Sequence, residues 1–295
     1  MNSQHGSLKH SYHNIRLLIP SLYHSHRFVF FVVMSVINSK HRFIRIVFLG
    51  LLVCLLFLNT KYEVPVWIYA LLVLSYLLLL FYGSYFVQSN FFVKALCNGS
   101  RSEKTIALSF DDGPMRNFTP TLLDILKSEN VPATFFLIGK NISGNEDLVN
   151  RMLAEGHVIG NHSYSHTYWF SLNKSETIYA DLKKCDEEIL RVAGKRPKFF
   201  RPPYGVTNPM VAKATTQGNY QCIGWSIRTY DTNAKSADAL LKKSLHNLQG
   251  GDIILFHDWG AHTIGIISDF IKEARARGFT FVTTDKLLGV DAYYH

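Results

Sequence analysis

The chain of 295 residues has room for one large domain or two small ones, and its net charge of +9 is concentrated near the N-terminus. The first 45 residues carry +6 and the other 250 carry only +3, so the C-terminal part lacks the basic, aromatic-rich surface typical of nucleic-acid-binding domains. Four cysteines, Cys54, Cys97, Cys185 and Cys222, have no paired spacing, which argues against a disulfide scaffold or a zinc ribbon.

The first 42 residues form a basic N-terminal arm. We expect it to bind anionic membrane lipid from the cytoplasmic side rather than nucleic acid. Its apolar run, residues 28–37, is too short to span a membrane. We interpret this run as interfacial or as part of an upstream start, with Met34 as the alternative to Met1.

Two longer apolar segments occupy residues 43–87. The first, 43–59, contains only one charged residue, Arg45, and the second, 64–87, contains none. We therefore predict a transmembrane helical hairpin, which makes the chain an integral membrane protein. Two spans would return the C-terminal domain to the side of the arm, whereas one span would place it on the opposite side, and the sequence leaves both open. We interpret residues 88–103 as a linker.

Residues 104–295 alternate between short apolar runs and amphipathic segments. Seven such strand–helix units predict an α/β fold with a parallel sheet, closed or nearly closed as a distorted (β/α)7–8 barrel. Side chains at the C-terminal ends of the strands would then share one active-site face. The predicted strands are 105–110, 133–138, 157–160, 199–200, 221–227, 252–256 and 279–283. One helix is predicted to begin at residue 119, and the other predicted helices are 146–154, 174–192, 209–217, 236–247 and 264–277.

Two adjacent carboxylates, Asp111 and Asp112, follow the first of these strands and precede a Gly-Pro turn. Neighbouring strand residues point to opposite faces, so both can reach one site only where the backbone turns. Their mutual repulsion requires a cation beside them. Downstream, His162 and His166 are four residues apart, and one helical turn would place both imidazoles near a single ion.

Asp112, His162 and His166 therefore form a predicted site for one divalent metal, with open positions for water and substrate. This donor set favours Zn²⁺, with Co²⁺ or another first-row ion tolerated. Asp111, next to that ion, is the predicted general base. Arg201, between two phenylalanines and two prolines, is a candidate partner that would keep Asp111 ionised and oriented.

His257 directly follows the strand 252–256. It is a predicted proton donor to a leaving group, provided that a carboxylate raises its pKa. Asp231 and Asp258 are both candidates for that carboxylate. Tryptophans flank these segments and either stack on sugar rings or belong to the core; they are Trp169, Trp225 and Trp259.

Five motifs occur in order: SFDDGP, HSYSH, RPPYG, WSIRTYD and LFH. In order and spacing they resemble the motifs of the polysaccharide deacetylases, carbohydrate esterase family 4, over roughly residues 104–289. The resemblance implies a distorted barrel that uses a divalent metal to remove acyl groups, usually N-acetyl groups, from N-acetylglucosamine units.

The resemblance also implies roles for individual residues. Asp111 would be the base and Arg201 the residue that holds it, with Asp231 paired to Arg201 or tuning His257, the acid. The backbone N–H of Tyr204 would bind the oxyanion, and Leu255 would line the acetyl pocket. Trp225 is a further candidate for substrate contact.

The fourth motif departs from the family pattern, because Arg228 replaces its first aspartate and Thr232 its tryptophan. Substrate contacts there are therefore open. We expect a membrane-anchored deacetylase of N-acetyl or O-acetyl groups whose partners are a glycan and membrane lipid, with no protein partner indicated. The alternatives are a deacylase of a lipid-linked sugar at the membrane surface and a catalytically idle glycan-binding module.

Overall fold

The computed structural model describes residues 40–294, so most of the predicted basic arm, including the run 28–37 and Met34, lies outside the described residues. The described residues divide into two compact units, the first ending at Leu77 and the second beginning at Leu78.

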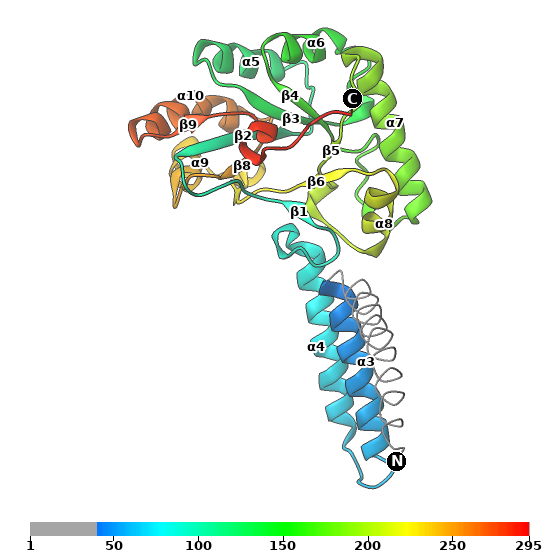
Figure 1. Cartoon of the computed structure of the whole chain (residues 1–295). Coiled ribbons are helices and arrows are strands. Elements are labelled where there is room, and N and C mark those ends of the chain that lie inside the picture. Colours follow the sequence, from blue (N-terminus) through cyan, green and yellow to red (C-terminus); the bar gives the residue numbers. More distant parts are fainter. Residues whose placement is uncertain (1–39, 295) are drawn as a thin grey trace, which may run out of the picture. The chain divides into compact units, whose positions relative to one another are not determined.

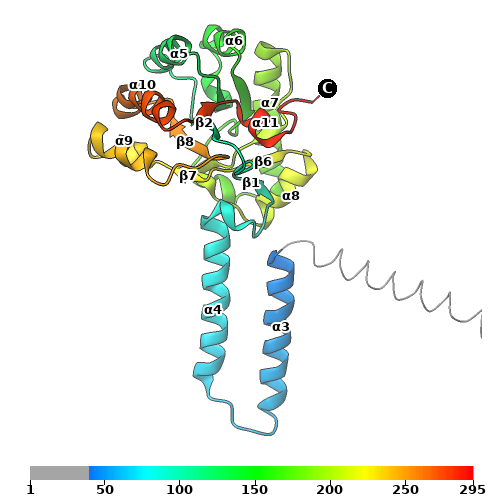
Figure 2. The same ribbon diagram turned by 60° about the vertical axis from the view of Figure 1, so that its left-hand side comes forward.

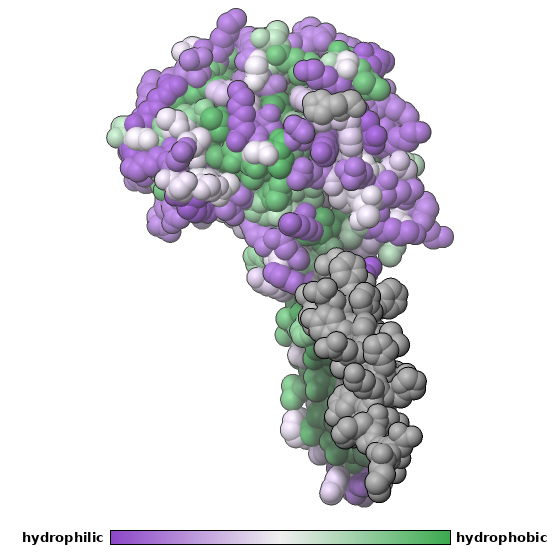
Figure 3. Space-filling model, in the orientation of Figure 1, coloured by the Kyte–Doolittle hydropathy of each residue, from purple (hydrophilic) through white to green (hydrophobic). Residues whose placement is uncertain are grey.

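The first unit contains helix α3 (Lys40–Leu58) and most of helix α4 (Val66–Tyr85). Both are long and apolar enough to cross a membrane, and α3 has no buried residue. The rings of Phe48 and Tyr76 stack with their centroids 4.2 Å apart. Hydrophobic side chains dominate the visible surface of the α4 region, whereas the surface of the second unit is mainly hydrophilic (Figure 3).

The second unit is an α/β structure in which helices surround a sheet (Figures 1 and 2). Its strands are β1 (Ala95–Leu96), β2 (Thr105–Asp111), β3 (Ala133–Leu137), β4 (Val158–Asn161), β5 (Phe199–Phe200), β6 (Gln221–Ile223), β7 (Ile227–Arg228), β8 (Ile253–His257) and β9 (Thr280–Phe281). Its further helices are α5 (Thr119–Ser128), α6 (Glu146–Ala154), α7 (Ser175–Ala193), α8 (Pro209–Gln217), α9 (Ala237–Leu245), α10 (Ala261–Ala276) and α11 (Thr284–Leu288), with 3₁₀ turns at Val87–Ser89, Gly139–Asn141, Phe170–Leu172, Pro203–Gly205 and Asp231–Asn233.

All strand pairs of this sheet are parallel, in the order β1-β6-β5-β4-β3-β2-β8-β7, and β9 pairs with β2 outside this path. The parallel α/β class and the distorted barrel are thus confirmed. Within the described residues the end strands β1 and β7 do not pair with each other, so the barrel stays open along one side.

Successive side chains of β2 point alternately to the core beneath the helices and to the site. Leu108 and Phe110 face the core that packs against α5 and α10, and the rings of Phe135, Phe110 and Phe256 stack across three adjacent strands. Because strand neighbours point to opposite faces, Ser109 and Asp111 face the inside of the open barrel. A well-packed outer layer therefore fixes the position of the polar inner residues.

Two predictions about elements were wrong. Residues 88–103 are not only a linker, because they contain β1, which pairs with β6, and Val93 and Ala95 are buried in the second core. The predicted strand 221–227 is broken into β6 and β7, which lie at opposite sides of the opening. The segment between them crosses the gap, with Gly224 N–H donating to Leu96 O and Ser226 N–H donating to Ile253 O.

Candidate active site

The carboxylates of Asp111 and Asp112 lie in one cavity of about 230 Å³. Asp111 ends β2 on its inward face and is buried. At Asp112 the backbone takes a φ of 76°, a left-handed conformation that turns the second carboxylate toward the same space. The predicted turn at the end of the strand is therefore present.

His162 and His166 lie close together, but no helix joins them as the spacing had suggested. A loop follows β4 instead, and it takes left-handed backbone conformations at Ser163 (φ 67°) and His166 (φ 45°). The two imidazole centroids are 4.8 Å apart. Non-glycine residues rarely adopt these angles, and such strain gathers at functional sites.

One carboxylate oxygen, Asp112 Oδ1, faces both imidazoles. It lies 3.5 Å from His162 Nε2 and 3.4 Å from His166 Nε2. His162 Nδ1 is 2.8 Å from the carbonyl oxygen of Arg201, which can only accept, so Nδ1 carries a proton and Nε2 is the ring atom that faces the carboxylates. Ligand atoms from Asp112, His162 and His166 all lie within 4.8 Å of one another.

These three side chains fit a cation. Asp112 Oδ1 is buried and has no hydrogen-bond partner in the described structure, whereas Asp112 Oδ2 accepts from Trp259 Nε1 at 2.9 Å. An unpaired buried carboxylate oxygen is costly unless a positive ion neutralises it. One orphaned oxygen between two imidazole nitrogens is the arrangement that a divalent ion satisfies.

The pKa shifts in this cluster favour ligation at Asp112 and His166. Burial would lower the pKa of His162, but the charges of Asp111 and Asp112 raise it. Burial alone would raise the pKa of Asp112, but contact with His162 and the charges of His162 and His257 hold this pKa well below its ordinary value. Burial and the charge of His162 lower the pKa of His166 to about 4. Asp112 is therefore ionised and His166 neutral near pH 7, as metal coordination requires.

Arg201 holds Asp111 from the interior of the barrel. Its side chain is fully buried, and Nη1 donates to Asp111 Oδ1 at 2.7 Å and to Ser109 Oγ at 2.9 Å. Its other nitrogens donate to the carbonyl oxygens of Ile223 at 3.3 Å and Gly224 at 2.8 Å. The guanidinium is thus fixed on all sides and leaves Oδ2 of Asp111 directed toward His162, 3.7 Å from its Nε2.

His257 forms a second pair with Asp231. Its Nδ1 lies 2.8 Å from Asp231 Oδ1, and Asp231 Oδ2 accepts from the His257 backbone N–H at 2.7 Å and from Thr263 Oγ1 at 2.8 Å. Burial would lower the pKa of His257, but Asp231 raises it to about 9. Of the two candidate carboxylates, Asp231 is the partner, since Asp258 accepts from Thr119 Oγ1 at 2.6 Å.

The other predicted substrate residues also line the cavity, namely Tyr204, Trp225 and Leu255. Tyr204 has a φ of 59°, and Trp225 comes from the segment that crosses the barrel opening. Arg228 and Thr232 of the altered fourth motif line the same cavity. Trp169 does not, and it is 64% exposed.

Sequence reasoning missed Ser109 and Thr263, and it missed the hydrogen bond that Trp259, named above only for stacking or the core, donates to Asp112. Ser109 bonds Arg201 and lies two residues before Asp111, so strand alternation would have placed it on the inner face. Thr263, on α10, and the indole donor of Trp259 reach the site only through tertiary folding. Their sequence positions alone carried no signal for these contacts.

Comparison with known proteins finds one family, polysaccharide deacetylase, matched over residues 98–223. A peptidoglycan-N-acetylglucosamine deacetylase of Bacillus cereus is 40% identical over 190 residues, which are 63% of this chain and 69% of that protein. PgdA, the same kind of enzyme from Listeria monocytogenes, is 36% identical over 190 residues, or 64% of this chain, but the match spans only 40% of its length.

A crystal structure of a peptidoglycan N-acetylglucosamine deacetylase superposes with a TM-score of 0.63 at 37% identity. The superposition covers 67% of this chain and 94% of the other.

Proposed function

This chain belongs to the polysaccharide deacetylase family, and from that premise we propose that it is a metal-dependent hydrolase that removes N-acetyl groups from a glycan containing N-acetylglucosamine. One observation carries the proposal. The unpaired Oδ1 of Asp112 lies between the Nε2 atoms of His162 and His166, next to the Asp111–Arg201 pair.

Asp112, His162 and His166 would hold one divalent ion, for which the ligand chemistry favours Zn²⁺. When bound, such an ion supplies Lewis acidity, which lowers the pKa of water and polarises a carbonyl oxygen.

Asp111 would accept the proton of the attacking water. Arg201 occupies Oδ1 of this carboxylate, so Oδ2 is the accepting atom. Because the guanidinium is locked by four hydrogen bonds, the carboxylate is oriented before substrate arrives. The backbone N–H of Tyr204 would donate to the oxyanion that forms as water adds to the acetamide carbon.

His257 would complete the reaction by giving a proton to the departing amine. Its Nε2 faces the cavity, 4.0 Å from Asp112 Oδ2, while Nδ1–H is held by Asp231. A histidine whose pKa is raised stays protonated at neutral pH and is ready to act as an acid. Leu255 and Trp225 would enclose the acetyl group and the sugar.

We further propose that α3 and α4 anchor the enzyme in a membrane, since both have the length and hydropathy for it. The basic arm of residues 1–42 would contact anionic lipid. The hydrolase domain would follow the two helices and include residues 104–295. Such an anchor favours a lipid-linked sugar as a second substrate class, beside a polymeric glycan.

The test uses the full chain in detergent and measures acetate released from N-acetylglucosamine oligomers, peptidoglycan fragments and a lipid-linked N-acetylglucosamine. We expect release from at least one of them, loss of release after treatment with chelator, and recovery after addition of Zn²⁺. Release that persists undiminished in the fully chelated protein would refute metal dependence. A chain that binds these glycans but releases no acetate when loaded with metal would be the idle binding module.

A further inference from the structure

A groove of about 700 Å³ lies beside β7 and α9 and is rich in basic side chains. Arg228, Lys242 and Lys243 line it, and we call these three residues and the space between them the basic groove. Lys242 and Lys243 are exposed on α9, whereas Arg228 is half-buried at the end of β7.

The basic groove adjoins the catalytic cavity, because Arg228 lines both. The ring of Tyr230, which also lines the cavity, lies between two cations. The Arg228 guanidinium is 4.9 Å from its centroid, and the Lys243 ammonium is 3.9 Å from it. Two cations of the basic groove therefore contact one ring of the cavity lining.

The positive charge of the basic groove is not neutralised within the described chain. Its one acidic lining residue, Asp252, is buried and paired with Arg101 at 2.5 Å. In the described part of the chain, Arg228, Lys242 and Lys243 have no ion pair with a carboxylate. Cations held close together without a counter-charge repel one another, so a bound anion would stabilise them.

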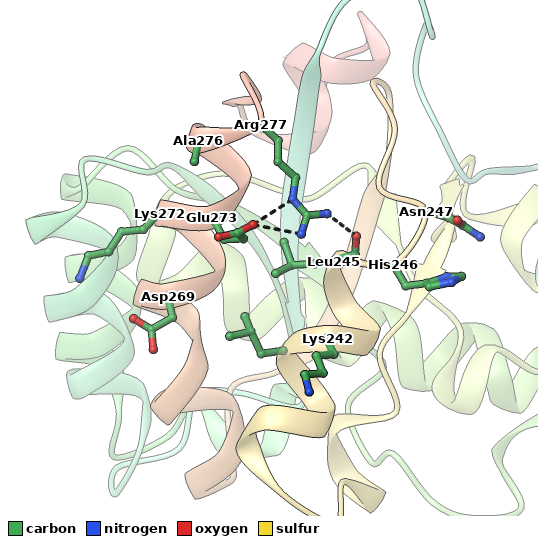
Figure 4. Close-up of a pocket in the computed structure, with 10 residues that line it drawn as sticks. Lys242, Leu245, His246, Asn247, Asp269, Lys272, Glu273, Ala276 and Arg277 are labelled. Atoms are coloured by element: carbon green, nitrogen blue, oxygen red, sulfur yellow. Dashed lines mark hydrogen bonds and ion pairs between the residues drawn. The ribbon is translucent and has the colours of Figure 1, made fainter.

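The neighbouring groove between α9 and α10 differs in charge (Figure 4). There Arg277 is paired with Glu273 and also donates to the carbonyl oxygen of Leu245 at 2.9 Å, and Asp269 adds a second acid. Lys242 lines both grooves, whereas Lys272 lines only this one. Arg228 and Lys243, which have no ion pair in the described chain, thus line only the basic groove of these two, and Lys242 is shared with its neighbour.

We propose that the basic groove binds an anionic substituent of the substrate glycan, a carboxylate or a phosphate, while the acetamido group occupies the catalytic cavity. The proposal rests on the deacetylase function proposed above. A guanidinium offers two parallel N–H donors to either anion, and the lysines add point charges. Arg228 stands where the family pattern has an aspartate, so a cation lines the cavity at the position of an anion in that pattern.

The test compares kcat/KM for acetate release from a neutral N-acetylglucosamine oligomer with that for oligomers of equal length carrying a carboxylate or a phosphate. The full chain in detergent should favour an acidic oligomer by about tenfold or more, and added salt should reduce the preference. Arg228→Gln and Lys243→Gln should each lower the acidic-to-neutral ratio severalfold, mainly through KM. The preferred acidic oligomer shows whether the groove binds a carboxylate or a phosphate.

Lys272→Gln is the matched control, since it removes an exposed charge from the neighbouring groove and should leave the ratio unchanged. Binding of the same oligomers to the Asp111→Asn chain, measured by calorimetry, reports on the groove without turnover. Equal preference for neutral and acidic oligomers in both measurements would overturn the groove proposal and leave the deacetylase proposal standing. Binding of acidic oligomers without any acetate release by the metal-loaded native chain would reject the deacetylase instead.

Discussion

Asp231 controls two properties of His257, its orientation and its charge. One oxygen of the carboxylate holds Nδ1, and the other accepts from the backbone N–H of the same residue. Thr263 Oγ1 fixes the carboxylate in turn. The imidazole therefore presents Nε2 to the cavity, and it keeps its proton at pH values well above the ordinary pKa of a histidine.

Replacing Asp231 by Asn should move the alkaline limb of the pH–activity profile toward lower pH. In the native chain the pKa of His257 is raised to about 9, so the acid form persists as pH rises through neutrality. Without the carboxylate the pKa falls toward 6.5, and the acid is lost at lower pH. The measurement is kcat against pH for both chains, and an unmoved alkaline limb would show that His257 is not the titrating acid.

Single residues at strand ends were the most predictable part of the site. Asp111, Arg201 and His257 lie together because parallel strands bring their C-terminal ends to one face. The conformation of the segment between His162 and His166 was not predictable, since spacing of four residues indicates a helix but left-handed backbone angles build a loop. Such angles depend on packing around the segment rather than on its own sequence.

At the scale of elements, the turn after β2 leaves no room at Gly113. A Cβ atom there would lie within 2.7 Å of the Asp258 carboxyl carbon. Asp258 is buried and bonded to Thr119, so it cannot readily move away. The glycine of this turn is therefore required by close packing, and the same turn sets the positions of Asp111 and Asp112.

Gly113→Ala should lower the midpoint of thermal unfolding, because overpacking of this kind costs about 1–3 kcal/mol. Circular dichroism of both chains measures the shift. Gly265→Ala, inside α10 with nothing within 4 Å of the added Cβ, is the matched control. It should leave the midpoint unchanged or raise it, since Ala favours a helix by about 1 kcal/mol over Gly. Equal midpoints for Gly113→Ala and the native chain would show that the turn can relax.

The elements themselves were predicted with uneven success. Helices with a clear apolar face, such as α7, agree closely with the predicted range 174–192. The run 221–227 was predicted as one strand, but β6 and β7 pair with strands on opposite sides of the barrel opening. Gly224 marks the break in the sequence, whereas the pairing partners of the two strands depend on distant segments.

At the scale of the whole molecule, the second unit begins well before the first catalytic motif. Val87, Phe91 and Val93 are buried within it, and β1 pairs with β6. The parallel α/β architecture followed from the alternation of strands and helices, whereas β1 is only two residues long and gave no periodic signal.

A chain that begins at Lys104 should therefore be less stable than one that begins at Leu78. The shorter chain loses the buried side chains of Val87, Phe91 and Val93 among others. Each of these three contributes about 1.5–3 kcal/mol, and their sum approaches the whole stability of an ordinary domain. Denaturant unfolding of both chains in the same detergent measures the difference. Equal midpoints would indicate that β1 and the residues before it contribute nothing to the fold.

The account as a whole depends on different roles for two adjacent carboxylates. Asp111 is assigned to proton transfer and Asp112 to the metal, which gives the two substitutions different consequences. The most direct test measures acetate release and bound metal per chain in the same samples of Asp111→Asn and Asp112→Asn. We predict that Asp111→Asn retains the metal but loses about 10²–10⁴-fold in kcat, and that Asp112→Asn loses both. Full acetate release by Asp111→Asn would contradict the account.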